Sequence, residues 1–239
     1  YHRSIGITDL TIFSNDCTDG TDSLLDRLDD LDVLRHYPNP TFLTDAASHQ
    51  PFAIQYAQRL RAVRRADWVI SMDADEFINI HVGDGTFAAL VEALPDADAI
   101  ALSHLDFGSS HIEHFEDGFV TERMVNCQEV HPDRPTRRGI KTLVGKTAKI
   151  LRASNHRPVF DDPEGNDLVW YSCAGQRMPM EYATGKNKGI DCRGAYELAQ
   201  MNHYAVKSVD AYAVRQFRGN VNNKKNKFWA LLLESLELS

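Results

Sequence analysis

The residues from Ala66 to Ile80 read ADWVISMDADEFINI and set an apolar run, Trp68 to Met72, directly before a group of carboxylates. These belong to Asp73, Asp75 and Glu76, three acidic residues within four positions. The apolar run is typical of a buried strand, and ligands of parallel α/β sheets bind beyond the carboxyl ends of such strands. Because like charges this close repel each other, we expect a cation at the end of this strand.

Helices and strands alternate on both sides of this stretch. Apolar and β-branched runs predict strands at 8–14, 68–72 and 98–108. Apolar residues at helical spacing predict helices at 23–31, 51–65 and 86–94. Turn-forming residues link the first strand to the first helix as half of a βαβ unit. The alternation predicts an α/β fold with a mostly parallel sheet flanked by helices.

The second half of the chain is less regular and is expected to be rich in loops. Strands are predicted at 118–126 and 141–151, between stretches of Pro, Gly, His and Asp. A helix is predicted at 208–219, where Ser208 can cap its amino end and Gly219 can stop it. A last apolar helix is predicted at 228–236. Since no repeat or linker divides the sequence, we expect one domain over residues 1–239.

Composition excludes several classes of protein. The chain has 239 residues, of which 43% are hydrophobic, so it can bury a sizeable core. It has no apolar run of about 18 residues, so no transmembrane segment is expected. The net charge of -8 argues against a nucleic acid polymer as a partner, because proteins that bind phosphate backbones need a basic surface.

The four cysteines are scattered and form no CxxC pair: Cys17, Cys127, Cys173 and Cys192. Neither a zinc ribbon nor a disulfide framework is therefore indicated. This usage favours a reducing compartment, and we expect a cytoplasmic protein. Association with a membrane through a partner or a missing segment is left open.

Carboxylate oxygens suit hard divalent cations, so the acidic group predicts bound Mg²⁺ or Mn²⁺. Such an ion typically takes one or two protein carboxylates and shares the rest of its shell with phosphates and water. The alternative is a solvated acidic strand end that holds no ligand. An EF-hand is excluded, because the glycine needed at the sixth position of its loop is Ile78 here.

Four motifs occur in a characteristic order along the chain. They are SNDCTDGTD at 14–22, DADEF at 73–77, FGSSH at 107–111, and NHYAVKS at 202–208 followed by RQFRG at 215–219. Together they resemble glycosyltransferases of the GT-A fold, particularly family 2 and its relatives. The resemblance extends from residue 1 to residue 219. It implies a Rossmann-like GT-A domain, in which the second motif is the DxD motif that holds metal and diphosphate.

The sequence departs from the family pattern at two places. The first strand of the family precedes the pair Tyr1 and His2, and we expect this strand and part of the nucleotide pocket to be missing from the sequence. In the motif FGSSH, His111 stands where the family usually has a glycine.

The resemblance implies a metal-dependent glycosyltransferase, which moves a sugar from a nucleotide-diphosphate sugar to a hydroxyl of a glycan or another acceptor. Asp75 is then the main metal ligand, and Asp73 contacts the ion through water or touches the ribose. His203 is implied as a further metal ligand, and Lys207 as a partner of a phosphate. Asn15 and Asp16 are implied to meet the base and ribose, although both also suit the turn in which they lie. A divalent ion, Mn²⁺ or Mg²⁺, would stabilise the departing diphosphate.

An inverting enzyme of this kind also needs a base that takes the proton from the acceptor hydroxyl. Asp106 is one candidate, because it lies beside the FGSSH motif. Asp161 and Asp162, in a polar loop, are weaker alternatives. His111 and His114 are interpreted as part of a loop near the acceptor, because no further ligands at zinc-like spacing accompany them.

Two other functions are compatible with the same residues. One is a nucleotidyltransferase that activates sugar phosphates, which usually carries a Gly-rich, basic loop near its first strand. The other is a carbohydrate- or metal-binding module that keeps the fold without turnover. The presence of Asp73, Asp75 and His203 argues against the loss of catalysis in the second alternative but leaves it open.

Overall fold

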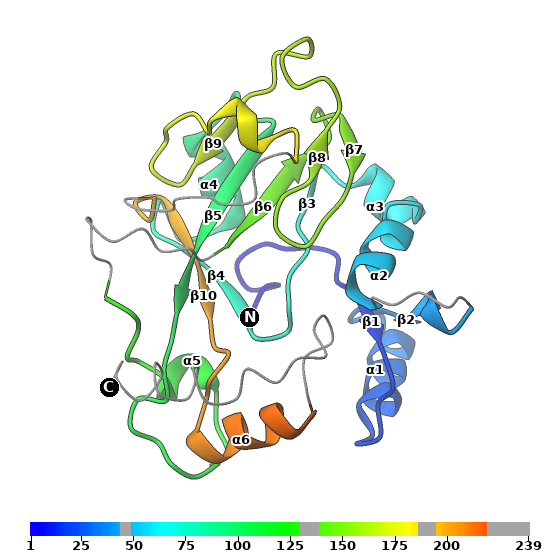
Figure 1. Ribbon diagram of the computed structural model, residues 1–239, viewed down its shortest axis with the longest axis vertical. Helices are drawn as coiled ribbons and strands as arrows, with labels where there is room; N and C mark the ends of the chain where they lie inside the picture. Colours follow the sequence, from blue (N-terminus) through cyan, green and yellow to red (C-terminus); the bar gives the residue numbers. More distant parts are fainter. Residues whose placement is uncertain (44–48, 130–138, 186–194, 219–239) are drawn as a thin grey trace.

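The computed structural model describes residues 1–43, 49–129, 139–185 and 195–218, and one mixed β-sheet is the largest element among them (Figure 1). In these residues the sheet has six strands, in the order β3, β6, β5, β10 and β4, with β9 paired to β5. The strands are β3 (Trp68–Val69), β4 (Glu76–Ile80), β5 (Ala99–Asp106), β6 (Ile140–Gly145), β9 (Trp170–Ser172) and β10 (Ala199–His203).

The presence of both helices and strands confirms an α/β fold, but the strand directions do not give a mostly parallel sheet. β5 runs parallel to β10 and β9, whereas it is antiparallel to β6. The pairs β3–β6 and β10–β4 are also antiparallel. The parallel expectation came from the alternation of helices and strands in the first half of the sequence. β6 comes from the second half of the chain, where the sequence shows no such alternation, and it is antiparallel to both of its neighbours.

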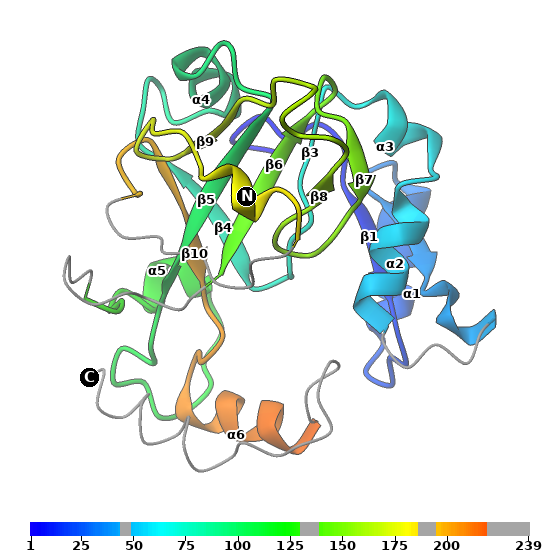
Figure 2. The same ribbon diagram turned by 45° about the horizontal axis from the view of Figure 1, so that its top comes forward.

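A separate βαβ unit forms at the start of the chain, where the sequence predicted its first half. β1 (Thr11–Ser14) and β2 (Arg35–Pro38) pair in parallel, and α1 (Thr21–Asp30) connects them. His36 joins the three elements, since its Nε2 lies 2.7 Å from the Ser14 hydroxyl and its Nδ1 lies 2.7 Å from Asp26 Oδ1. The unit lies beside the main sheet with α2 and α3, on the side of β3 (Figures 1 and 2).

Most of the predicted helices are present, with shifted bounds. The helix predicted at 51–65 is divided into α2 (His49–Ala57) and α3 (Arg61–Arg65), because the backbone of Leu60 is extended. α4 (Phe87–Ala93) begins after Thr86, whose side chain accepts a hydrogen bond from the backbone of Ala89. α6 (Val209–Arg218) begins after Ser208, which caps it in the same way through the backbone of Ala211. The helix predicted at 228–236 lies outside the described residues.

The strand predicted at 118–126 is wrong, because a short helix, α5 (Val120–Arg123), occupies this segment. Val120 and Met124 are four residues apart, which is the spacing of one helical turn. Met124 is buried, whereas Phe119 and Val125 are exposed. The backbone N–H groups of Arg123 and Met124 donate to the carbonyls of Phe119 and Val120, four residues earlier, so the segment forms helical hydrogen bonds within itself.

The remaining elements are short. β7 (Ile150–Arg152) and β8 (Val159–Phe160) form an antiparallel pair within the segment predicted as a strand at 141–151 and the loop after it. Two 3₁₀ helices span Pro40–Leu43 and Met180–Tyr182. None of the helices in the described part of the chain combines the length and the hydrophobicity that a membrane crossing requires.

The core covers both faces of β5. Ile100 and Leu102 pack on one face, in a cluster that includes Leu90 of α4. Ala99 and Ala101 pack on the other face, in a cluster that includes Trp170 of β9. A strand buried on both faces reads as a continuous apolar run, and this explains why 98–108 could be recognised from the sequence.

The register of β10 decides which polar residues meet at the end of the sheet. His203, its last residue, is paired with Asp106 at the end of β5 and with Glu76 at the start of β4. The acidic residues 73–76 therefore lie at the carboxyl ends of β5 and β10. α6 lies beyond these ends in both views (Figures 1 and 2).

We expect the substitution His36→Leu to destabilise the protein by about 1 to 3 kcal/mol, because it leaves the partly buried Ser14 hydroxyl without its partner. Urea denaturation followed by circular dichroism measures this change. His81→Leu is the matched control, since His81 is exposed on the surface. Equal stability of the two variants would show that the contacts of His36 do not hold the βαβ unit together.

Candidate functional site

The acidic loop, defined as Asp73 to Glu76, is held in place by its own backbone and by β10. The backbone N–H of Asp73 donates to Glu76 Oε2 (2.8 Å), and that of Glu76 donates to the Asp73 carbonyl (3.1 Å). The carbonyl of Asp75 accepts from the backbone of Tyr204 (2.9 Å), one residue beyond β10. These contacts leave the side chains of Asp73 and Asp75 to reach other parts of the site.

A buried ion pair between Lys141 and Glu76 holds this loop in place. Lys141 Nζ lies 2.9 Å from Glu76 Oε2, and the side chains are 0% and 1% exposed. Lys141 also lies 3.4 Å from Asp73 Oδ2 and donates to Asn155 Oδ1. Burial raises the pKa of the Glu76 carboxyl above its ordinary value, and the charge of Lys141 opposes this rise.

His203 connects the acidic loop to β5. Its Nδ1 lies 2.6 Å from Asp106 Oδ1, and its Nε2 lies 3.8 Å from Asp75 Oδ1. Burial lowers the pKa of the His203 imidazole, and the charge of Asp75 opposes this change. The two nitrogens of one ring thus face two carboxylates that belong to different strands and loops.

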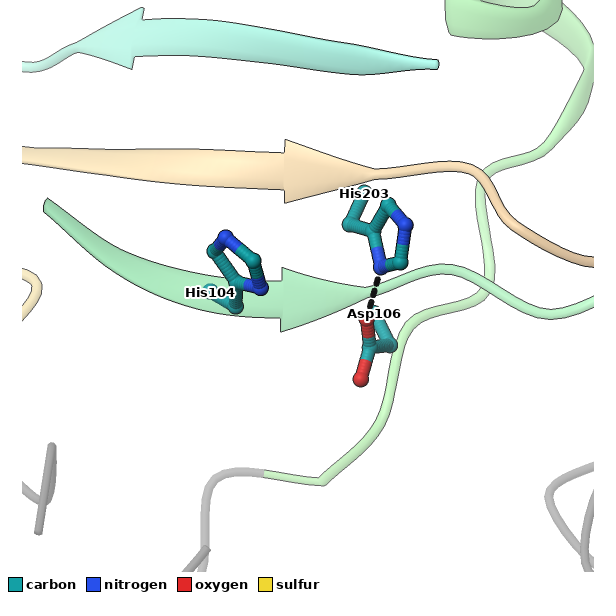
Figure 3. A group of neighbouring side chains, drawn as sticks. All are labelled: His104, Asp106 and His203. Carbon is teal, nitrogen blue, oxygen red and sulfur yellow. Dashed lines mark hydrogen bonds and ion pairs between the residues drawn. The ribbon is translucent and has the colours of Figure 1, made fainter. Parts of the chain in front are cut away.

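Three side chains at this end of the sheet could hold a metal ion: His104, Asp106 and His203. Each offers one ligand atom, and these atoms all lie within 4.8 Å of one another. Figure 3 shows His104 and Asp106 on β5 and His203 at the end of the adjacent β10. His104 Nε2 also lies 3.4 Å from Glu76 Oε1, so this group borders the buried ion pair.

Arg215 approaches the same loop from α6. Its Nη1 lies 3.5 Å from Asp75 Oδ2 and donates to the carbonyl of Ala205. Two protein cations, Arg215 and Lys141, thus supply part of the positive charge that the group of acidic residues led us to expect. The site also contains four carboxylates, so with neutral histidines its formal charge is -2 (four negative charges against two positive ones). One divalent cation would balance this charge.

The turn that carries Asn15 and Asp16 is linked to the acidic loop by polar side chains. Asn15 Oδ1 accepts from the Thr41 hydroxyl (3.4 Å), which lies 2.8 Å from His49 Nδ1. The next residue, Gln50, donates to Asp73 Oδ1. Asn15 and Asp73 are therefore brought to the same side of the molecule, although 58 positions separate them in the sequence.

The other predicted residues lie in turns. Lys207, whose φ is 59°, is in the turn between β10 and α6. Asp161 and Asp162 follow β8, where the Asp162 carboxylate accepts from the backbone of Gly165. In the described part of the chain, the hydrogen bonds of these two aspartates stay within residues 149–166 and do not reach the acidic loop.

The two histidines interpreted as acceptor-side residues lie in the segment between β5 and α5. His111 and His114 border a hollow of about 570 Å³, which Arg123 also lines. This segment is joined to α6, because the backbone of Phe115 donates to the Asp210 carboxylate (2.8 Å). The hollow is thus next to the helix that carries Arg215.

Three residues of the site were not predicted from the sequence: His104, Lys141 and Arg215. His104 is two residues before Asp106, a spacing that places both on one face of a strand. Lys141 is a lone cation inside an apolar strand, a pattern that indicates a buried partner of opposite charge. Arg215 begins the RQFRG motif. The partners of all three come from distant positions, which no local pattern can identify.

No model of a protein family matches this sequence, and no curated protein matches it either.

We expect Lys141→Met to destabilise the protein by about 3 to 5 kcal/mol, because it leaves the buried Glu76 carboxylate without its cation. The double variant Lys141→Met and Glu76→Leu should recover most of this loss, since it removes both charges. Chemical denaturation measures both values. Lys146→Met is the control, because Lys146 and Asp67 form an exposed pair. A double variant no more stable than the single one would contradict this assignment.

Proposed function

We propose that this chain is a metal-dependent glycosyltransferase of the GT-A type, which transfers a sugar from a nucleotide-diphosphate sugar to a hydroxyl of a glycan or another acceptor. The observation that supports this proposal most is the approach of His203 Nε2 to Asp75 Oδ1, 3.8 Å apart. These two residues belong to two of the sequence motifs and are 128 positions apart. They meet at the carboxyl ends of strands, where open α/β sheets bind ligands.

The metal in this proposal is held by Asp75 and the Nε2 atom of His203. When bound, a divalent ion acts as a Lewis acid on the departing diphosphate. Imidazole suits Mn²⁺ better than Mg²⁺, which prefers oxygen ligands, so we propose Mn²⁺ as the better cofactor. Asp73 is restrained by Gln50 and Lys141, which suits a contact with the ion through water or with the ribose.

The negative diphosphate requires positive partners besides the metal. Arg215 is a suitable one, because its guanidinium is already beside Asp75 and can form paired hydrogen bonds with phosphate oxygens. Lys207 follows β10 in the same part of the chain and is the second candidate. Both cations come from the segment 204–218, so donor binding would be shared between the acidic loop and the region of α6.

The nucleotide in this proposal lies between the Asn15–Asp16 turn and the acidic loop. The chain of contacts through Thr41, His49 and Gln50 connects these two places with groups that both donate and accept hydrogen bonds. Such groups are suited to a base and a ribose. The acceptor would then approach from the side of β5 and the segment that follows it.

We expect Asp75→Asn to weaken Mn²⁺-dependent binding of a nucleoside diphosphate by tenfold or more, because it removes a negative ligand of the ion. Titration calorimetry with UDP and then GDP, each with Mn²⁺ and with EDTA, measures this loss. Asp167→Asn is the matched control, since Asp167 lies in an exposed turn and has a positive φ that Asn also adopts. The metal assignment fails if Asp75→Asn keeps the Mn²⁺ dependence of the unchanged protein.

A second variant separates the two possible ligand groups. If Asp75 and His203 hold the ion, His104→Ala should change its affinity much less than Asp75→Asn does. If His104, Asp106 and His203 hold it, His104→Ala should lower the affinity for the ion as much as Asp75→Asn does, or more. Mn²⁺ binding followed by electron paramagnetic resonance decides between the two.

The reaction is tested by incubating the protein with Mn²⁺, a panel of nucleotide sugars and mixed glycan acceptors. Transfer, or slower hydrolysis of the donor, releases nucleoside diphosphate, and we expect this product. Pyrophosphate released from a nucleoside triphosphate and a sugar phosphate would instead indicate a nucleotidyltransferase. Binding of sugar nucleotides without either product would indicate a binding module.

A further inference from the structure

The pair Asp106 and His203 has an orientation that constrains where the proton of the imidazole lies. The two residues are in register on adjacent parallel strands, and the backbone N–H of Phe107 donates to the His203 carbonyl (2.9 Å). The side chains are 22% and 21% exposed, so neither is free to turn in bulk water. Figure 3 shows the Nδ1 atom of His203 directed at the Asp106 carboxylate.

A neutral imidazole carries one proton, and an ionised carboxylate can only accept a hydrogen bond. Between a neutral imidazole and an ionised carboxylate, the 2.6 Å contact with Asp106 therefore places the proton of His203 on Nδ1. Nε2 then has an unshared electron pair, and this pair faces Asp75 Oδ1 at 3.8 Å. Two acceptors face each other in this arrangement, which is unfavourable unless a positive charge lies between them.

The 3.8 Å separation fits a shared metal ion. Ligand atoms bound to an ion at about 2.1 Å each are at most about 4.2 Å apart. Arg215 contacts Asp75 through the other carboxylate oxygen, Oδ2, so it does not take the place between Oδ1 and His203. Histidine ligands of metals commonly donate their other ring N–H to a carboxylate, which fixes the orientation of the ring.

We propose that Asp106 is a positioning residue, which holds His203 with its proton on Nδ1 so that Nε2 is presented to a cation beside Asp75. This inference rests on the metal site of the proposed function. It gives Asp106 a role on His203 in place of the role of base toward the acceptor. It also assigns a different role to each ring nitrogen of His203: Nδ1 orients the ring and Nε2 binds the ion.

The position of the proton is measured directly by NMR. Long-range ¹⁵N–¹H correlation spectra of protein labelled on histidine distinguish a protonated Nδ1 from a protonated Nε2. The spectrum of His203→Gln identifies the signals of His203 by their loss. The measurement is made without metal or nucleotide at about pH 8, where a histidine is neutral. We expect the proton on Nδ1 in the unchanged protein.

The variant that tests the role of Asp106 is Asp106→Asn, which keeps the shape of the side chain. The amide can donate to Nδ1, and the proton of the ring can then move to Nε2, where Asp75 accepts it. We therefore expect the Nε2–H form in this variant, together with a 10- to 100-fold loss of Zn²⁺ and Mn²⁺ affinity. Asp117→Asn, in an exposed loop, is the matched control and should change neither the position of the proton nor the metal affinity.

Zn²⁺ is diamagnetic, so the spectra can also be recorded with the metal bound. We expect Zn²⁺ to shift the Nε2 signal and to leave the proton on Nδ1. If His104, Asp106 and His203 hold the ion together, with Nδ1 of His203 as a ligand, Zn²⁺ shifts the Nδ1 signal and leaves the proton on Nε2. The inference is then wrong. It is also wrong if the unchanged protein has its proton on Nε2, or if Asp106→Asn alters neither the proton position nor the affinity.

These outcomes are independent of catalysis. A protein that binds Zn²⁺ through Nε2 but transfers no sugar would retain the inference and lose the proposed function. A protein that transfers sugar with the proton of His203 on Nε2 would retain the proposed function and lose the inference. Where Asp106→Asn fails to fold, as judged from its circular dichroism, the proton position and the Zn²⁺ shift in the unchanged protein still decide the question.

Discussion

The buried ion pair between Glu76 and Lys141 is the interaction on which the geometry of this site depends. Glu76 begins β4 and Lys141 lies in β6, and β5 and β10 separate these strands in the sheet. Neighbouring strands are about 4.8 Å apart, and two strands lie between β4 and β6. The side chains of Glu76 and Lys141 therefore meet because the sheet curls. The carboxylate that bonds Lys141 also accepts from the backbone of Asp73, so the ion pair fixes the acidic loop as well.

This arrangement divides the acidic residues according to their surroundings. Glu76 is buried and neutralised within the protein, and Asp73 is restrained by Lys141 and Gln50. Asp75 contacts His203 and Arg215 instead. Lys141 thus contacts Asp73 and Glu76, and Arg215 contacts Asp75. With Asp106 included, four carboxylates against two protein cations leave a formal charge of -2, which one divalent ion can balance. Rigid support of this kind is what a metal or phosphate site needs.

Asp106 and His203 show how the sheet combines this support with a possible function. Their strands are parallel neighbours, so the register alone brings the carboxylate to one ring nitrogen. The acidic loop, held by the ion pair of Glu76 and Lys141, brings Asp75 to the second ring nitrogen. The proposals on the metal, the donor and the role of Asp106 all depend on these two placements.

The sequence alone indicated that helices and strands alternate in the first half, that 98–108 contains a strand and that Asp73, Asp75 and His203 belong to motifs. These features are local: apolar periodicity, turn formers and short motifs are set by neighbouring residues. It did not reveal the antiparallel pairs, the helix in place of a strand at 118–126, or the partners of His104, Lys141 and Arg215. Only the tertiary structure decided these, because the direction and register of strands such as β6 and β10 depend on burial and pairing between distant residues. The meeting of Asp75 with His203, 128 positions later, is decided at the same level.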